Sequence, residues 1–244
     1  MASDPAAPPP FIPSSVDAVV FDIGGVFIHP HYQPVEDRMI ELGLRPPEDR
    51  SIHRRAHHCA VHVLSLALAE NGTRPDETKP EMWTIYDDAY ADVLGVPAEH
   101  RPALELSVRR DWTWTHAENI AAFHRLTATG MPCAIVSNNV GTAPEQMREH
   151  GVCQVGDGPL PSVAAIVDSA LEGVAKPDPA IFTPALEALG VEPARALYVG
   201  DTVHADIHGA ANAGMQAVQL DPFDDHTAFD HHRLPDLDAL EAAL

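Results

Sequence analysis

A short apolar run ends in an aspartate in the stretch VVFDIGGV, residues 19–26. Residues 16–21 are mostly apolar and predict a buried strand. The pair Gly24 and Gly25 permits a tight turn and a close approach of the backbone directly after it. Asp22 is therefore expected at the carboxyl end of a strand, which is where open α/β sheets bind their ligands.

Three further segments, far apart along the chain, carry polar residues of complementary kinds. They are AIVSNN (134–139) with Ser137, GVAKPD (173–178) with Lys176, and YVGDTVHAD (198–206) with Asp201 and Asp206. Each follows a strand-like run or begins a helix-like one, so a parallel sheet would gather them at its carboxyl edge. One aspartate after a strand indicates little, whereas four such segments in order predict a site.

The periodicity predicts a doubly wound α/β core that is interrupted by helices. From about residue 32 to residue 112 the strand signal fades, and glycine and proline separate helix-like segments over 35–42, 53–70, 81–94 and 98–109. Beyond that block, strands and helices alternate regularly. We expect a Rossmann-like parallel core over 16–31 and 113–244, and a helical cap over 32–112 that closes over the strand ends.

Composition bounds the class of protein. The chain has 244 residues and a formal net charge of −21, which argues against a nucleic-acid partner because phosphates demand a basic surface. No stretch approaches the roughly 18 apolar residues that span a bilayer. Residues 1–15 are rich in proline and alanine and lack the features of a signal peptide, so we expect a disordered tail and a cytoplasmic protein without a membrane partner. We expect a monomer or homodimer.

Cysteine and lysine usage adds two smaller indications. The three cysteines, Cys59, Cys133 and Cys153, are scattered and predict reduced, packed thiols rather than a disulfide framework. Lysine occurs only at Lys79 and Lys176, whereas arginine supplies the other 13 of the 15 basic residues. A lysine at position 176 therefore suggests that a compact point charge is needed there.

The four segments resemble motifs I to IV of the haloacid dehalogenase superfamily, in its phosphatase-like branch with a helical C1-type cap inserted after motif I. The match runs over nearly all of residues 16–244. It is most specific in EGVAKPDP (172–179) and from Gly200-Asp201 to Gly214-Met215. The resemblance implies a Mg²⁺-dependent hydrolase of a small phosphomonoester, with a small phosphorylated metabolite as its substrate.

The resemblance also assigns the chemistry of phosphoryl transfer, which needs an in-line nucleophile and neutralisation of charge on the transferred group. Asp22 would attack phosphorus and form an aspartyl-phosphate intermediate. Ser137 would donate a hydrogen bond to a phosphoryl oxygen, with Asn138 beside it as a further substrate contact. Lys176 would pair with the phosphoryl group and keep Asp22 ionised.

A magnesium site is implied at the same place. Asp22 and Asp201, with the main-chain carbonyl of Gly24, would bind Mg²⁺, which prefers oxygen ligands in an octahedron. Asp206 would orient this site without binding the metal directly, either by holding the ligands or through a water molecule. Backbone N–H groups of Ile23 and Gly24 would help to cradle the phosphate.

Gly24 departs from the pattern, because most phosphatases of the superfamily carry at that position an aspartate that protonates the leaving group. Glycine keeps the carbonyl for the metal but removes the acid, whose help is typically worth ~10²–10⁴ in rate. We therefore expect a preference for leaving groups that depart easily as anions, such as aryl, acyl or anomeric sugar phosphates. His29 and His31 are alternative acids, although a packing or surface role is the simpler interpretation.

Four competing functions follow from the same residues. A dehalogenase would need no divalent metal, which makes the acids at Asp201 and Asp206 superfluous. A phosphonate-cleaving enzyme would need a lysine in the cap, and only Lys79 is available, in a loop between Thr78 and Pro80. A phosphomutase would need the missing acid even more than a hydrolase. A catalytically weakened binding or regulatory protein would explain the glycine but not the retained acids and lysine.

Two groups of residues lie outside these motifs. Histidines and aromatic residues recur at helical spacings in the expected cap. We expect His53, His57, His58 and His62 on a solvated or packed helix face rather than at a metal site. We expect Trp83, Tyr86 and Tyr90 to pack between cap helices rather than to contact substrate. The acidic and histidine residues at 224–226 and 230–232 are expected to form a polar connection to the last helix, which we predict over 237–244.

Overall fold

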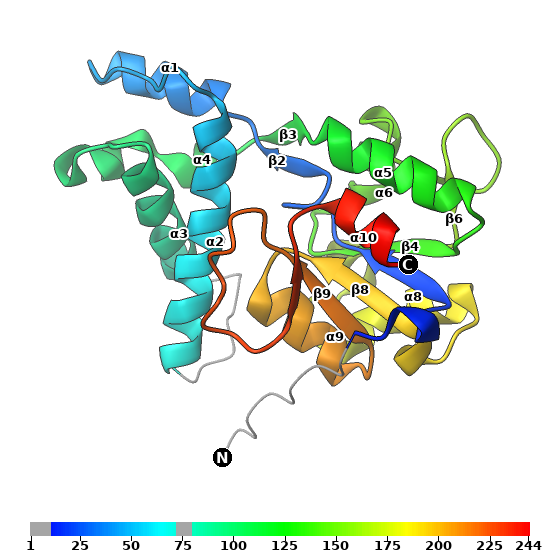
Figure 1. Cartoon of the computed structure of the whole chain (residues 1–244). Helices are drawn as coiled ribbons and strands as arrows, with labels where there is room; N and C mark the ends of the chain where they lie inside the picture. Colours follow the sequence, from blue (N-terminus) through cyan, green and yellow to red (C-terminus); the bar gives the residue numbers. More distant parts are fainter. Residues whose placement is uncertain (1–10, 72–79) are drawn as a thin grey trace. The chain divides into compact units, whose positions relative to one another are not determined.

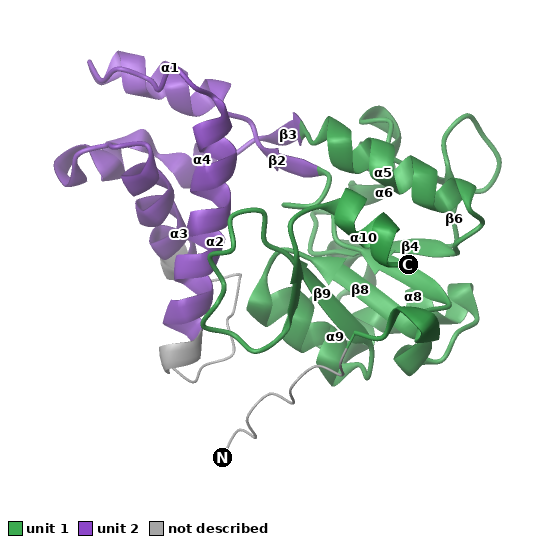
Figure 2. Ribbon diagram, viewed as in Figure 1, with its two compact units in different colours: residues 1–27, 115–244 green, residues 28–114 purple. Residues whose placement is uncertain are grey.

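The computed structural model describes residues 11–71 and 80–244. The chain forms two compact units, one made of Met1–Phe27 with Thr115–Leu244 and the other of Ile28–Trp114 (Figure 2). The helical unit therefore begins at residue 28 and ends at residue 114, whereas the sequence predicted a cap over 32–112. Each unit has its own hydrophobic cluster of buried residues.

The first unit contains a six-stranded sheet in which neighbouring strands are parallel. From one edge to the other its order is β10 (His232–Leu234), β9 (Gln216–Leu220), β8 (Ala196–Gly200), β1 (Ala18–Phe21), β4 (Cys133–Ser137) and β7 (Ile166–Asp168). The predicted α/β fold with a parallel sheet is confirmed. The apolar residues over 163–167 predict one weak strand, but the structure has two there. Strand β6 (Ser162–Val163) pairs with β5 (Gln154–Val155) in a separate small sheet, and β7 follows in the main sheet.

Strand β1 is central, and its two faces are buried against different helices. Its four residues are all 0% exposed. Val20 belongs to a cluster with Ala185 of α8 (Thr183–Leu189) and Ala210 of α9 (His208–Asn212). Phe21 points the other way and meets Phe123 of α5 (Ala117–Ala128) edge to face at 5.3 Å. Because strand side chains alternate, β1 needs apolar residues throughout, and helices cover both faces of the sheet (Figure 1).

The remaining elements of this unit connect and flank the strands. They are η1 (Pro13–Ser15), α6 (Ala143–Glu149), α7 (Ser169–Glu172), η3 (Pro179–Phe182), η4 (Pro193–Arg195), a π-helical turn over Val203–Ile207, and α10 (Leu237–Ala243). In the tail expected to be disordered over residues 1–15, residues 13–15 form a 3₁₀ turn, and the N–H of Ile12 donates to Oε1 of Gln216 at 2.8 Å. Residues 1–10 lie outside the described residues.

The start of α6 corrects one sequence prediction. The pattern Thr142 to Glu145 predicts a capping box, but the Thr142 side chain makes no capping hydrogen bond to the helix and donates instead to Oδ1 of Asn139 at 3.2 Å. The carboxylate of Asp168, at the end of β7, accepts from the N–H groups of Gly141 and Ala143 at 3.0 Å each. A residue distant in sequence therefore caps this helix, which local pattern alone does not reveal.

The second unit is built mainly of helices. Its elements are β2 (Ile28–Pro30), α1 (Gln33–Glu41), α2 (Ser51–Asn71), α3 (Pro80–Val93), η2 (Ala98–Leu104), α4 (Leu106–Arg109) and β3 (Trp112–Thr115). The short β2–β3 pair was not predicted, because three- and four-residue strands carry too little periodicity to detect.

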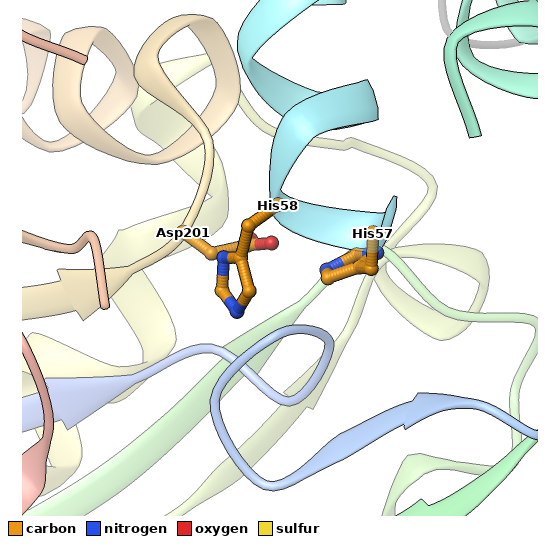
Figure 3. A group of neighbouring side chains, drawn as sticks. All are labelled: His57, His58 and Asp201. Atoms are coloured by element: carbon orange, nitrogen blue, oxygen red, sulfur yellow. The ribbon is translucent and has the colours of Figure 1, made fainter. Parts of the chain in front are cut away.

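Histidines and tyrosines of α2 and α3 form part of the core of this helical unit, so the histidines take the packed of the two arrangements that the sequence left open. His53 Nδ1 lies 2.9 Å from the hydroxyl of Tyr90, and His57 Nδ1 lies 2.8 Å from the hydroxyl of Tyr86. All four side chains are buried. His58 follows on α2 and is buried as well (Figure 3). In the two histidine–tyrosine pairs, Nδ1 of the histidine and the tyrosine hydroxyl therefore satisfy each other inside the unit.

Candidate active site

Three adjacent strands of the first unit bring predicted site residues to one edge of the sheet. Asp22 directly follows β1, Ser137 is the last residue of β4, and Asp201 directly follows β8. Since β1 lies between β8 and β4 and all three are parallel, their carboxyl ends meet. Each of these three side chains is buried, with at most 7% of the residue exposed.

Lys176 lies at the centre of the cluster. Its Nζ is 2.8 Å from Oδ1 of Asp22 and 2.7 Å from Oδ1 of Asp206, and it donates to the hydroxyl of Tyr198 at 2.9 Å. These contacts engage three partners, as many as an ammonium group has hydrogens. The lysine is only 4% exposed, so its charge is placed by these partners rather than by water.

Asn138 holds the backbone of Lys176 from the end of β4. The lysine N–H donates to Oδ1 of Asn138 at 2.8 Å, and Nδ2 of Asn138 donates to the lysine carbonyl at 3.1 Å. The peptide bond between Lys176 and Pro177 is cis. Asn138 was predicted as a substrate contact, but both ends of its side-chain amide bond the lysine backbone, which is a supporting role.

Asp206 organises the loop after β8. Its Oδ2 accepts from the N–H of Asp201 at 3.1 Å, from the N–H of Thr202 at 2.9 Å and from the Thr202 hydroxyl at 2.7 Å. A Cβ added at Gly200 would come within 2.4 Å of the Asp206 carboxyl carbon, so only glycine fits beside it. With Oδ1 bonded to Lys176, both oxygens of Asp206 are already in use.

Tyr198 is a member of the cluster that the sequence reasoning missed. Its hydroxyl donates to the carbonyl of Val136 at 2.8 Å and lies 3.2 Å from Oδ1 of Asp206, beside the ammonium of Lys176. The hydroxyl thus connects β8 to β4 and to the lysine. The one available signal was a tyrosine inside a fully buried strand, since such a residue needs a polar partner at its tip.

Burial and mutual charge set the protonation of the cluster. Burial raises the pKa of Asp22 to about 7. The charge of Lys176 opposes this rise, whereas the carboxylates of Asp206 and Asp201 add to it. Burial acts against the charge of Lys176, but Asp206 and Asp22 outweigh it and raise the lysine pKa. Burial likewise acts against the charge of Asp206, yet Lys176 and the donors of Thr202 lower its pKa. Lysine and Asp206 therefore form a stable ion pair, whereas Asp22 retains a proton more readily.

The residues present fit a divalent cation. Asp22, Asp201 and Asp206 each offer a carboxylate oxygen, and these oxygens all lie within 4.8 Å of one another. When Asp22 is ionised, three carboxylates against one ammonium leave an excess of two negative charges, which a divalent ion would balance. Because both oxygens of Asp206 accept hydrogen bonds from the protein, Asp22 and Asp201 are the better direct ligands.

The glycines after Asp22 differ in what they permit. Gly25 has φ +65°, and a Cβ there would come within 2.1 Å of Oδ2 of Asp201, so the backbone packs directly on this carboxylate. Gly24 is not among the residues with positive φ, which leaves its backbone open to other amino acids. Ile23 is buried, and its carbonyl accepts from the N–H of Phe27 at 2.9 Å as the turn closes.

The other candidate acids belong to the helical unit. His29 is fully buried there, with Nε2 3.4 Å from Nε2 of His58. Nδ1 of His31 accepts from the N–H of Gln33 at 3.1 Å. Both histidines thus have structural roles within that unit. Lys79, the one cap lysine considered for a phosphonate-cleaving enzyme, lies outside the described residues.

A family model for haloacid dehalogenase-like hydrolases matches residues 16–214, most of the chain and all of the site residues. The chain belongs to this hydrolase family. Among curated relatives, a phosphoserine phosphatase from Thermus thermophilus is 31% identical over 138 residues, which cover 56% of this chain and 53% of the relative. A glyceraldehyde 3-phosphate phosphatase from Pyrococcus furiosus is 49% identical over 53 residues, 22% of each protein.

The match therefore spans about half the length of the first relative and about a fifth of the second. A solved structure, a phosphatase of the same superfamily from Thermococcus onnurineus, is similar over 93% of this hydrolase and 97% of that chain, with a TM-score of 0.54 and 21% identity. At that identity the likeness establishes the fold alone. Among the described helices, none is both long and apolar enough to cross a membrane.

Proposed function

We propose that this hydrolase is a Mg²⁺-dependent phosphatase that acts on a small phosphomonoester through an aspartyl-phosphate on Asp22. The observation that carries the proposal is the buried ammonium of Lys176, 2.8 Å from Oδ1 of Asp22 and 2.7 Å from Oδ1 of Asp206. A lysine at that place can both hold a nucleophilic carboxylate and neutralise a phosphoryl group. The phosphatase names of the curated relatives support the same reaction class.

In the proposed reaction a carboxylate oxygen of Asp22 attacks phosphorus, and the bond between phosphorus and the ester oxygen breaks. The leaving alkoxide takes a proton from water, because no acid stands at Gly24. Water then attacks the phosphorus of the aspartyl-phosphate, releases inorganic phosphate and regenerates the carboxylate. The hydroxyl of Ser137 and the backbone N–H groups of Ile23 and Gly24 would bind the phosphoryl oxygens throughout.

Asp22 and Asp201 would hold the magnesium ion, with the Gly24 carbonyl as a third ligand from the protein. When bound, Mg²⁺ supplies positive charge beside the phosphoryl oxygens and favours the ionised form of the nucleophile. Asp206 holds the N–H of Asp201 and the ammonium of Lys176, so its part is to keep both at fixed positions. The helical unit Ile28–Trp114 is proposed as the cap, and cytoplasmic residence, as a monomer or homodimer, completes the proposal.

The substrate preference follows from Gly24. Without an acid to protonate the departing oxygen, rates should rise steeply as the leaving group becomes a better anion. Aryl, acyl and anomeric sugar phosphates are therefore the proposed substrate class. A series of aryl phosphates of different leaving-group pKa tests this point, and a flat dependence, or best activity on plain alkyl phosphates, would contradict it.

The direct test of function is a panel of phosphorylated metabolites with Mg²⁺, measured beside an Asp22→Asn variant. Turnover that requires both the metal and Asp22 supports the phosphatase. The second candidate is a binding or regulatory protein whose chemistry has decayed, and Gly24 is the observation in its favour. Binding of a phosphorylated metabolite without turnover of any activated aryl phosphate would support that alternative.

A further inference from the structure

A chain of hydrogen bonds runs from the partly buried His231, near the C-terminus of the hydrolase, to the loop that carries Asp201. Gln219, on β9, is 0% exposed, and its Nε2 donates to the carbonyl of Asp201 at 2.7 Å. At its other end, Oε1 of Gln219 lies 2.6 Å from Nε2 of His231. All three residues belong to the first compact unit.

Donor and acceptor roles in this chain can be assigned by elimination. A carbonyl oxygen only accepts, so the Gln219 nitrogen must face Asp201 and its amide oxygen must face His231. His231 must then carry its hydrogen on Nε2. Burial, aided by the charge of Arg233, lowers the pKa of His231 to about 4, so at neutral pH the ring is uncharged with a single N–H. The N–H of His231 thereby bonds the amide oxygen and supports the orientation that the Asp201 carbonyl requires.

Register explains why Gln219 reaches this carbonyl. Gly200, the last residue of β8, pairs with Gln219 of the adjacent β9, so the glutamine lies beside the point where Asp201 leaves the sheet. On the other side Gln219 pairs with Arg233 of β10, two residues after His231. Pairing of three neighbouring strands thus brings the hydrogen-bonded residues together. Gln219 is 18 residues from Asp201 and 12 residues from His231 along the sequence.

The backbone of Asp201 is held from both sides as a result. Its N–H donates to Oδ2 of Asp206 at 3.1 Å, and its carbonyl accepts from Gln219 at 2.7 Å. These two bonds fix the direction in which its side chain leaves the backbone. The carboxylate has little room to adjust, since a Cβ on Gly25 would lie only 2.1 Å from its Oδ2.

We propose that Gln219, oriented by His231, is a positioning residue that holds Asp201 in place to bind the divalent cation. The inference rests on the proposed function, in which Asp201 is a metal ligand. It adds two residues to the site that touch neither substrate nor metal. The C-terminal segment, expected from sequence to be only a polar connection, thereby acquires a role in the site.

The test measures Mn²⁺ binding to the full chain by calorimetry, without substrate, together with the Mg²⁺ concentration that half-activates turnover. Gln219→Met keeps the length of the side chain and removes both hydrogen bonds, and we expect Mn²⁺ affinity to fall by about 10–100-fold, as for other outer partners of metal ligands. The value of kcat at saturating metal should fall less. Gln154→Met is the matched control, because Gln154 is also a buried glutamine but bonds a different loop.

His231 provides the second arm. His231→Phe should weaken Mn²⁺ binding in the same direction, and His231→Gln, which keeps an N–H donor, should restore part of the loss. Because His231 acts only through Gln219, the double variant His231→Phe with Gln219→Met should bind Mn²⁺ no more weakly than Gln219→Met alone. Additive losses would overturn the proposed chain.

Three other results would overturn it. They are an affinity of Gln219→Met within twofold of the original protein, an equal loss in Gln154→Met, and an absence of Mn²⁺ binding by the original protein. Asp201→Asn defines the background affinity. If Gln219→Met fails to fold in metal-free far-ultraviolet dichroism, the His231 variants decide. Since Mn²⁺ binding needs no turnover, failure to hydrolyse any phosphoester would count against the proposed function alone.

Discussion

Replacing Gly25 with alanine should displace Asp201, the proposed metal ligand, by a distance that the structure specifies. The added Cβ would lie 2.1 Å from Oδ2 of Asp201, whereas real Cβ atoms essentially never approach closer than 3.0 Å. The carboxylate or the turn must therefore shift by about 0.9 Å, the difference between these two distances. A misplacement of about 1 Å at a reacting centre can lower the rate ~10²-fold, and we expect a loss of that order in kcat/KM.

The left-handed backbone of Gly25 adds a second effect, which a control must remove. Alanine at positive φ costs about 1–2 kcal/mol wherever it stands. Gly151 has φ +69°, close to the +65° of Gly25, and nothing lies within 4 Å of a Cβ placed there. Gly151→Ala should therefore be destabilised to a similar extent while it keeps its activity. The assay is hydrolysis of an activated aryl phosphate over a range of Mg²⁺ concentrations, beside the midpoint of urea unfolding. Equal activities of the two variants would refute the steric reasoning.

Three further predictions address the charges of the site and the missing acid. The backbone of Gly24 accepts a side chain, because its φ is not positive. Gly24→Asp should raise activity on alkyl phosphates relative to aryl phosphates by up to ~10²–10⁴ if only the acid is lacking. An unchanged ratio in a folded variant would argue against that explanation. Lys176→Met leaves the buried Asp206 carboxylate without its ion-pair partner. The variant should lose roughly 3–5 kcal/mol of unfolding free energy in metal-free buffer, and a loss below about 1 kcal/mol would contradict this prediction. Burial raises the pKa of Asp22 from 3.8 to about 7, so in the metal-free protein the folded state keeps this proton after the unfolded chain has lost it. That contribution to stability is complete below about pH 4 and disappears as the pH rises through 7. Asp22→Asn should remove this part of the pH dependence of unfolding, and an identical profile for both proteins would contradict it.

The order and type of the motif residues were readable from the chain because each lies at the end of a strong local signal. Asp22 and Asp201 follow apolar runs that predict buried strands. In the structure Asp22 lies directly after β1, and Asp201 lies directly after β8. The sheet itself was equally predictable, since strands that alternate with helices form parallel sheets. The weak strand near residue 165 was misjudged because the two short strands there, β6 and β7, join different sheets.

Supporting residues were much harder to predict. Tyr198, Asn138 and Gln219 look like ordinary members of strands or loops. What sets them apart is that each makes a hydrogen bond to a group 18–62 residues away. The same holds for Asp168, whose carboxylate caps a helix that begins 25 residues earlier. No pattern of neighbours along the chain encodes such pairs, because the partners meet only when strands adopt their register.

The sequence by itself determined which residues can do chemistry and that they follow strands, since apolar periodicity and turn-forming glycines act over a few neighbouring positions. It also determined that Gly24 brings no acid. Only the tertiary structure decided that Lys176 bonds Asp22, Asp206 and Tyr198 together, and that Gln219 reaches Asp201. The physical reason is that hydrogen bonds and ion pairs act over about 3 Å, and only the packing of the parallel strands brings these distant groups that close.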